Sequence, residues 1–330
     1  MKALVYTRPL EVTYRDEPDP QLAAGEVVLK IDAVGICGSD MHAYHGHDPR
    51  RNPPLILGHE LAGTVIAGPF VGKRFTANPL ITCGYCEYCV QGRNNLCANR
   101  TMVGMTRPGA FAERMSIPAS SLVEIPPVMD ARTAALTEPA ATALHALNLS
   151  MRAMQRPLGE AKLLVIGGGA IGMLVALLAK HYGCTDIRVA ETNALRRASV
   201  AKHAGVHAFD PLADKAVADN AMDLVVDAVG AKATRNAAFA AVKPGGVIMH
   251  VGLQDWASEI DMRKLTLAEI TLLGTYTYST ADLRATVAAL QAGAFGDLAW
   301  VEERPLAEGA RAFRDLHEGR SAAAKIVLRP

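Results

Sequence analysis

The stretch of sequence that decides the fold is Val165-Ile166-Gly167-Gly168-Gly169-Ala170-Ile171-Gly172. An apolar run leads into a G-x-G-x-x-G pattern, and a second apolar run follows it. Glycines at this spacing permit a tight turn, the approach of a pyrophosphate to backbone N–H groups, and close packing of helix on strand. The stretch therefore predicts a strand, a dinucleotide-binding turn and a helix. The cofactor-binding residues expected from it are Gly167, Gly169, Ala170, Ile171 and Gly172.

A carboxylate follows this turn at the spacing that a dinucleotide site requires. Glu191 lies nineteen positions beyond Gly172, at the end of the next predicted strand. There it can accept hydrogen bonds from a ribose 2′-OH, and it would repel a 2′-phosphate, so NAD is favoured over NADP. Arg196 and Arg197 lie close by and weaken that preference. A solvated glutamate at a strand end is the alternative interpretation of Glu191.

The sequence around the turn predicts an α/β protein of two domains. Strands alternate with helices from residue 162 onward, which predicts a parallel sheet covered by helices. Earlier, short apolar runs separated by Gly and Pro predict a β-rich domain, and a proline-started helix over 140–154 connects the two. The predicted strands are 162–166, 186–190, 223–229, 246–252, 269–278 and 324–328; the predicted helices are 171–182, 194–204 and 281–292.

Composition narrows the class of partner. The chain has 330 residues, with 34 basic against 33 acidic side chains, so it has no global field for nucleic acid or an anionic membrane. The longest uncharged apolar run, 163–179, contains three glycines and is not expected to span a membrane. The first residues lack a signal-peptide pattern, and six cysteines are too few for a disulfide scaffold. We expect a cytoplasmic protein with a small-molecule substrate.

The strongest metal signal is Cys83-Gly84-Tyr85-Cys86-Glu87-Tyr88-Cys89 followed by Cys97, a C-x2-C-x2-C-x7-C array. Four thiolates on one short loop match the closed tetrahedral coordination of a structural zinc. An iron–sulfur cluster and a metal-free reduced loop are the alternatives. A nucleic-acid-binding zinc ribbon is disfavoured, because the loop has few basic residues.

A second set of possible metal ligands is dispersed along the chain: Cys37, His59, Glu60 and Glu138. A mixed sulfur, nitrogen and carboxylate set with one open position is typical of a catalytic zinc. Each residue alone is weak support, since a lone cysteine is usually a small buried hydrophobe and a lone His-Glu pair is usually a surface pair.

Taken together and in this order, the motifs resemble those of the zinc-dependent medium-chain dehydrogenase/reductase family, over nearly the full length. They are Gly35-Ile36-Cys37-Gly38-Ser39-Asp40, Gly58-His59-Glu60, the four-cysteine loop, Glu138-Pro139 and the glycine turn. Within the family, Glu138-Pro139 followed by His145-Ala146 is similar to the sorbitol, threonine and sugar-alcohol dehydrogenase branch.

The resemblance implies an architecture and a set of cofactors. A GroES-like catalytic domain, 1–145 completed by 293–330, and a Rossmann NAD-binding domain, 146–292, would enclose the active site between them. Two zinc ions per chain and NAD are the implied cofactors. A homotetramer or homodimer is implied as well, and an apolar strand over 269–274 is suited to pairing with its symmetry mate.

The resemblance also implies roles for individual residues. Cys37 and His59 would ligate the catalytic zinc, with Glu60 and Glu138 binding it directly or through water. Asp40 would orient His59. Ser39 would pass the proton of the substrate hydroxyl to His42, and His45 or His47 could take the place of His42. The residues implied to contact the cofactor are Arg196, Val229, Val251 and Thr275.

Two features depart from the family pattern. The segment from His59 to Cys83 is several residues short, which predicts a trimmed hairpin. Thr277 stands where polyol dehydrogenases often have a substrate-contacting arginine, and this weakens the case for a polyol.

The function predicted from these patterns is NAD-dependent oxidation of a secondary alcohol: a polyol, a sugar or another small hydroxylated metabolite. A threonine-type or simple secondary-alcohol dehydrogenase and an NADP-dependent reductase are alternatives on the same fold. A zinc-free quinone or enoyl reductase is disfavoured by the retained Cys37, His59 and Glu138. A nucleotide-sensing zinc scaffold protein is the non-enzyme alternative.

Overall fold

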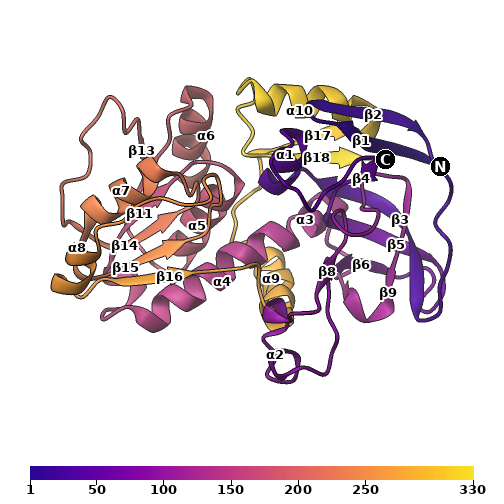
Figure 1. Ribbon diagram of the computed structural model, residues 1–330, viewed down its shortest axis with the longest axis horizontal. Coiled ribbons are helices and arrows are strands. Elements are labelled where there is room, and N and C mark those ends of the chain that lie inside the picture. The colour runs from indigo at the N-terminus through magenta and orange to yellow at the C-terminus, as the bar shows by residue number, and fades with distance from the viewer.

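A six-stranded parallel sheet forms one half of the molecule, in the order β13-β12-β11-β14-β15-β16. The computed structural model describes residues 1–330, and Figure 1 shows this sheet on the left, with helices on both faces. The strands are β11 Lys162–Ile166, β12 Asp186–Ala190, β13 His207–Phe209, β14 Met222–Asp227, β15 Val242–His250 and β16 Thr271–Gly274. The helices of this half are α5 Ala170–His181, α6 Ala194–Ala204, α7 Lys232–Ala241 and α8 Met262–Leu267, whereas α9 Thr280–Gln291 packs against α4 (Thr137–Ala153) in the middle of the molecule.

The apolar run of β11 explains why helices cover both faces of this sheet. Successive strand residues point to opposite faces, so Leu163 and Val165 join the core formed with α5, whereas Leu164 and Ile166 join the core formed with α7. All four side chains are buried. A continuous apolar strand therefore has to be covered on both faces, and the strand order places β11 inside the sheet between β12 and β14.

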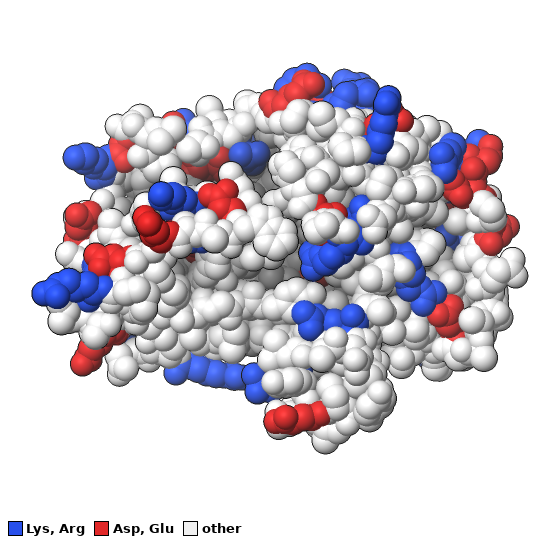
Figure 2. Space-filling model, viewed as in Figure 1, with Lys and Arg blue, Asp and Glu red and all other residues white.

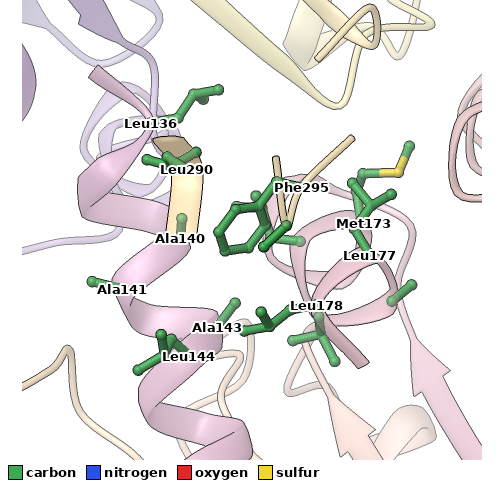
Figure 3. Close-up of a cluster of buried hydrophobic side chains, with 14 of the residues drawn as sticks. Leu136, Ala140, Ala141, Ala143, Leu144, Met173, Leu177, Leu178, Leu290 and Phe295 are labelled. Carbon is green, nitrogen blue, oxygen red and sulfur yellow. The ribbon is translucent and has the colours of Figure 1, made fainter. Parts of the chain in front are cut away.

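Helix α4 (Thr137–Ala153) runs across the middle of the molecule between its two halves (Figure 1). Pro139 lies in its first turn, where a missing N–H costs nothing. Figure 3 shows Ala140 and Ala143 of α4 on the side that faces Leu178 of α5 and the ring of Phe295. The small alanine side chains let the helices approach closely, and this makes α4 part of the main core.

The other half is β-rich and contains the C-terminal segment. Its largest sheet has the order β10-β6-β5-β3-β18-β17, with β9 also paired to β3. The predicted tail strand is confirmed, since β18 pairs antiparallel with β3. The strands are β1 Lys2–Arg8, β2 Glu11–Asp16, β3 Glu26–Gly35, β4 Leu55–Ile56, β5 Glu60–Ala67, β6 Arg74–Ala77, β7 Leu80–Ile81, β8 Thr101–Met102, β9 Arg114–Pro118, β10 Leu122–Glu124, β17 Val301–Pro305 and β18 Lys325–Arg329.

Short helices complete this half. The α-helices are α1 Gly38–Tyr44, α2 Glu87–Val90, α3 Ala131–Ala135 and α10 Gly309–His317. Three of the four 3-10 helices also lie here: η1 Asn94–Leu96, η2 Ala119–Ser121 and η4 Leu306–Glu308. The fourth, η3 Leu158–Glu160, precedes β11. The predicted hairpin is confirmed, because β5 and β6 pair antiparallel. No helix in the structure combines the length and the apolar character needed to cross a membrane.

The predicted strand over 269–278 is wrong in its length. Only β16 (Thr271–Gly274) is a strand, and Glu269 and Thr277 on either side have φ of 48° and 47°. A left-handed backbone cannot continue a strand. The turn at Thr277 takes the chain away from the sheet and directs Tyr278 into the interior, where it is fully buried. β16 is the edge strand, and its residues are alternately half-buried and exposed.

Candidate functional site

The four cysteines of the predicted structural site converge on the loop around α2. Their sulfur atoms all lie within 4.8 Å of one another, with 3.6 Å between the Sγ atoms of Cys83 and Cys97 and 4.0 Å between those of Cys83 and Cys89. Sulfurs around a tetrahedral zinc are about 3.8 Å apart. Backbone N–H groups of Tyr85 and Cys86 lower the pKa of Cys83 to about 6. The N–H of Cys89 lowers the pKa of Cys86, but burial and the neighbouring sulfurs outweigh it and raise that pKa to about 11, so metal-free protein keeps a proton in the cluster that a zinc ion would displace. The cluster therefore fits a zinc ion.

A second cluster forms at the cleft between the halves, from residues distant in sequence. The ligand atoms of Cys37, His59 and Glu60 lie within 4.8 Å of one another. Cys37 precedes α1, and the antiparallel pairing of β3 with β5 places Gly35 opposite Glu60. A Cβ atom at position 35 would overlap with Glu60 Oε2, so only glycine leaves room for this carboxylate.

His59 is arranged as a metal ligand with a supporting carboxylate. Its Nδ1 lies 3.5 Å from Asp40 Oδ1; both atoms are buried and neither has a hydrogen-bond partner. Burial alone would raise the pKa of Asp40, but His59, Arg51 and the N–H of Cys37 outweigh it and hold the pKa below its usual value. Asp40 is thus anionic and suited to accept the Nδ1 proton of a His59 that binds metal through Nε2.

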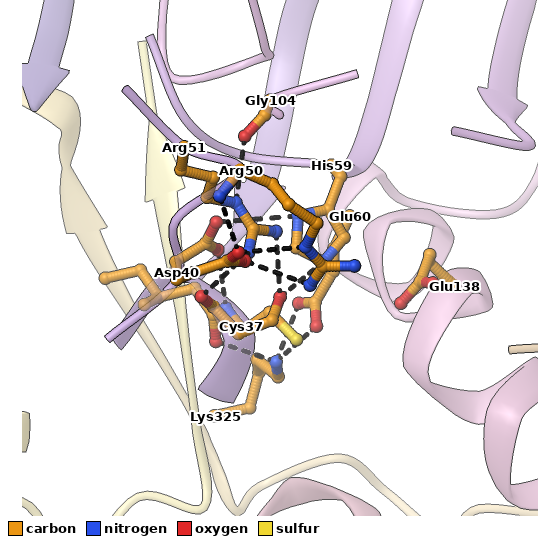
Figure 4. A network of polar contacts seen from close by, with 12 residues as sticks. Cys37, Asp40, Arg50, Arg51, His59, Glu60, Gly104, Glu138 and Lys325 are labelled. Carbon is orange, nitrogen blue, oxygen red and sulfur yellow. Dashed lines mark hydrogen bonds and ion pairs between the residues drawn. The ribbon is translucent and has the colours of Figure 1, made fainter. Parts of the chain in front are cut away.

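The two candidate carboxylates differ in their partners; Figure 4 shows Lys325 beside Glu60, with Glu138 apart from this network. Lys325 donates to both Glu60 oxygens at 2.6 and 2.7 Å, and both side chains are at most 2% exposed. Glu138 lies outside the close group of three and accepts a hydrogen bond from the Tyr278 hydroxyl at 2.9 Å. Burial raises the pKa of Glu138 to about 7. A cation therefore holds Glu60, whereas Glu138 has a neutral partner.

Ser39 and His42 both lie on α1, at a cavity of about 320 Å³. Ser39 Oγ is 3.5 Å from His59 Nε2 and accepts a hydrogen bond from Arg51 at 3.2 Å. His42 is half-buried and lines the same cavity. Figure 2 shows a hollow between the two halves of the molecule, with basic side chains at its border.

The other two candidate proton acceptors differ in position. His47 is exposed and lines the cavity, whereas His45 forms a 2.9 Å contact with His317 of α10. His42 and His47 therefore line the same cavity as Ser39, whereas His45 contacts α10.

The glycine turn has the geometry of a phosphate-binding loop. Gly167 has φ of 100°, and a Cβ atom there would collide with Val229. Glu191 is buried and accepts a hydrogen bond from the Gly168 N–H at 2.8 Å. Arg196 donates to both Glu191 oxygens, at 3.2 and 3.3 Å. The predicted ribose acceptor thus already has a cationic partner.

The last two predicted cofactor residues, Val251 and Thr275, directly follow the carboxyl ends of β15 and β16. In an open parallel sheet, ligands bind beyond the carboxyl ends of the strands. The Thr275 hydroxyl is buried without a hydrogen-bond partner. These positions are consistent with cofactor contacts.

Sequence analysis missed four residues of the cleft: Asp48, Arg51, Tyr278 and Lys325. A lysine in the apolar tail 324–328 was the one visible signal, because a buried strand has no use for an unpaired charge. Arg51 is fully buried and contacts Asp48, the carbonyl of Gly104 and Ser39. Nothing in its local sequence distinguishes it from a surface arginine.

Comparison with known proteins is consistent with this geometry. Residues 23–127 match the alcohol dehydrogenase GroES-like domain, and residues 170–292 match the zinc-binding dehydrogenase domain. The L-threonine 3-dehydrogenase of Pectobacterium carotovorum is 31% identical, covering 84% of each chain, and the L-galactonate-5-dehydrogenase of Escherichia coli is 31% identical, covering 83% of this chain and 82% of that one. A zinc-binding dehydrogenase structure from Sinorhizobium meliloti with bound NADP has a TM-score of 0.86 at 29% identity, covering 100% and 99% of the chains.

The chain belongs to the zinc-dependent alcohol dehydrogenase family of medium-chain dehydrogenases. It is an oxidoreductase of the NAD(P)-dependent kind, with a GroES-like domain and a Rossmann-type parallel sheet.

Proposed function

We propose that this enzyme oxidises a secondary alcohol with NAD⁺ at the Cys37, His59 and Glu60 cluster. The observation that carries the proposal is the convergence of three ligand atoms within 4.8 Å of one another, with Ser39 Oγ 3.5 Å from His59 Nε2. When bound at these residues, zinc would supply Lewis-acid polarisation of the hydroxyl, and a nicotinamide would supply the hydride acceptor. Glu138 faces this cluster and adds negative charge when it is ionised, a form that a bound zinc ion would favour.

The side chains around the cluster would hold and move the hydroxyl proton. Arg51 donates to Ser39 Oγ, which leaves one lone pair of that oxygen for the substrate proton and its own O–H for onward donation. His42, three residues further along α1, is the proposed acceptor. Asp40 keeps the His59 ring in one orientation throughout.

The cofactor is proposed to be NAD, bound at the turn formed by Gly167 to Gly172. Glu191 supports NAD because its carboxylate would repel the 2′-phosphate of NADP. Arg196 neutralises part of that charge, so the preference should be moderate.

Substrate, assembly and location complete the proposal. A polyol, a sugar or another small hydroxylated metabolite is the proposed substrate, and the threonine-type activity named for one relative is the second candidate. The exposed edge of β16 supports a homotetramer or homodimer through strand pairing. Six free cysteines support a reducing, cytoplasmic location.

A screen of NAD⁺ reduction by zinc-loaded protein over secondary alcohols, polyols, aldonates and amino alcohols tests the activity. Turnover of at least one class is expected, with NAD⁺ preferred over NADP⁺. Full zinc and NAD occupancy without turnover of any class would favour a sensing or scaffold role instead.

Stepwise chelation tests the proposal of two zinc ions. The cleft site needs an exchangeable position, whereas the cysteine site is closed. Mild chelation should therefore abolish activity before the thermal midpoint falls. Metal analysis that finds fewer than two zinc ions in fully active enzyme would contradict this.

A further inference from the structure

The cavity beside Ser39 contains more positive than negative charge. Three arginines and two aspartates line it, which leaves one positive charge: Arg50, Arg51 and Arg235 against Asp48 and Asp255. Arg235 has only neutral acceptors, the Asp255 carbonyl and the Ser258 hydroxyl. An uncompensated cation in a cleft attracts an anionic group.

Arg50 has the geometry to bind such a group. Its Nε and Nη2 donate to the two oxygens of Asp48 at 2.9 and 3.0 Å, while Nη1 makes no hydrogen bond. A guanidinium has five N–H donors, so the outer edge formed by Nη1 and Nη2 is still available. Such an edge binds a planar carboxylate in bidentate fashion.

The base under Arg50 is rigid. Asp48 also accepts from Arg51 at 2.6 Å, and the side chains of Asp48 and Arg51 are 6% and 0% exposed. Arg50 itself is 61% exposed. One buried carboxylate thus orients two guanidinium groups, of which Arg51 contacts Ser39 and Arg50 faces the solvent of the cavity.

We propose that this cavity is a carboxylate subsite and that the substrate is a hydroxy acid of the aldonate type. Its carboxylate binds the free edge of Arg50, and its reacting hydroxyl faces Ser39; this rests on the function proposed above. A volume of about 320 Å³ suits a small ligand. A single excess charge matches a carboxylate better than a phosphate dianion.

Matched pairs of substrates test the subsite: D-gluconate against D-sorbitol, L-idonate against L-iditol, and galactonate against galactitol. Each pair differs only in a carboxylate replacing a terminal hydroxymethyl group. The wild-type enzyme should have the higher kcat/KM for an aldonate. Arg50→Gln should lower the aldonate-to-alditol ratio of kcat/KM by about 10-fold to 100-fold, through loss of a charge-assisted bidentate contact.

Arg311→Gln is the control, because Arg311 is comparably exposed but lies on α10; its ratio should equal that of the wild type. A wild-type preference for alditols, or an unchanged ratio in Arg50→Gln, would overturn the proposal. The anion that Arg50 binds could be the carboxylate of the substrate or the pyrophosphate of the cofactor. The affinity for NADH, measured by fluorescence, distinguishes the two. If Arg50→Gln weakens NADH binding while the ratio stays constant, the cavity serves the cofactor pyrophosphate and the substrate assignment is wrong.

Calorimetric binding of the three aldonates to the NADH complex gives a readout that does not need turnover. Weaker aldonate binding by Arg50→Gln than by Arg311→Gln supports the subsite, whether or not any alcohol is oxidised. Absence of oxidation would count against the proposed dehydrogenase function and not against the subsite. Equal aldonate binding by the two variants, or no binding to the wild type, would overturn the subsite.

Discussion

The two clusters of metal ligands differ in how the chain brings their atoms together. The cysteine cluster uses four sulfurs between positions 83 and 97, on one loop around α2. The cleft cluster takes Cys37 from the start of α1 and His59 and Glu60 from the start of β5, with Glu138 facing it from α4. Loop spacing is sufficient for the first cluster, whereas sheet register is needed for the second.

Their electrostatic surroundings also differ. In the cysteine loop, Cys97 is buried and the other three cysteines are partly exposed. The cleft buries Asp40, Glu60 and Glu138 together with the cation Lys325. Buried charges depend on one another, because removal of one leaves its partner uncompensated. The comparison teaches that the local cluster is suited to support the fold, while the assembled cluster combines candidate metal ligands with a balance of buried charges.

Replacing one sulfur in each cluster gives the largest contrast. Cys37→Ala should lower kcat by more than the roughly 100-fold found when only the supporting groups of a metal are altered, and should leave one zinc per chain. Cys86→Ala should also leave one zinc, but it should mainly lower the thermal midpoint and change the kcat of folded enzyme less than about tenfold. Zinc analysis, calorimetric melting and steady-state kinetics check both. Equal loss of kcat in the two variants would break the distinction.

Lys325→Met tests the charge balance of the cleft. In metal-free protein the variant should lose about 3 to 5 kcal/mol of unfolding free energy, because Glu60 is left buried without its cation. Zinc-loaded protein should lose less, since the metal supplies a positive charge at the cluster. Urea unfolding of both forms measures the difference. Lys73→Met is the control: its pair with Glu124 is exposed, and a change below about 1 kcal/mol is expected. Equal losses with and without zinc would count against Glu60 as part of the zinc site.

Glu138→Gln tests whether the residue facing the cluster belongs to it. The variant keeps the side-chain volume and removes the negative charge that Glu138 carries when zinc holds it ionised, so zinc should bind less tightly and kcat should fall by roughly 10-fold to 100-fold. Tyr278→Phe, which removes only the hydroxyl that donates to Glu138, should have a smaller effect. If Glu138 only interacts with the helix dipole in the first turn of α4, the variant should lose a few tenths of a kcal/mol of unfolding free energy and keep its kcat. Wild-type kcat and zinc content would remove Glu138 from the site.

Glu191→Ala extends the comparison to the glycine turn and has the smallest expected effect. The variant removes the ribose acceptor and frees Arg196 for a 2′-phosphate. The preference for NAD⁺ over NADP⁺ should narrow by about tenfold or less, because Arg196 already offsets part of the charge. Ratios of kcat/KM for the two cofactors measure it. A wild-type enzyme that favours NADP⁺ would assign Arg196 to a phosphate and show that Glu191 has been misinterpreted.

Local patterns made much of the molecule predictable. The glycine turn between β11 and α5, the first strands and helices of the parallel sheet, and the four-cysteine loop were correctly located, because each depends on residues close in sequence. The short strand β13 and the helices α7 and α8 were not predicted. The strand predicted over 269–278 was too long because that prediction also used only residues close in sequence. Apolar composition predicts a strand there, but the left-handed Thr277 and the burial of Tyr278 against Glu138 end it at Gly274.

The sequence by itself determined the fold class and the four-cysteine donor set, since glycine spacing, thiol spacing and strand periodicity are properties of short segments. The dispersed set of Cys37, His59 and Glu60 could be named only through the family resemblance, because sheet register brings its atoms together. Only the tertiary structure decided which charges meet. Lys325 reaches Glu60 from a strand 265 positions away, and Arg51 joins Asp48 to Ser39 inside the cleft. The physical reason is that a buried charge needs a partner within a few ångströms, and the packing of the sheets supplies that partner from any part of the chain.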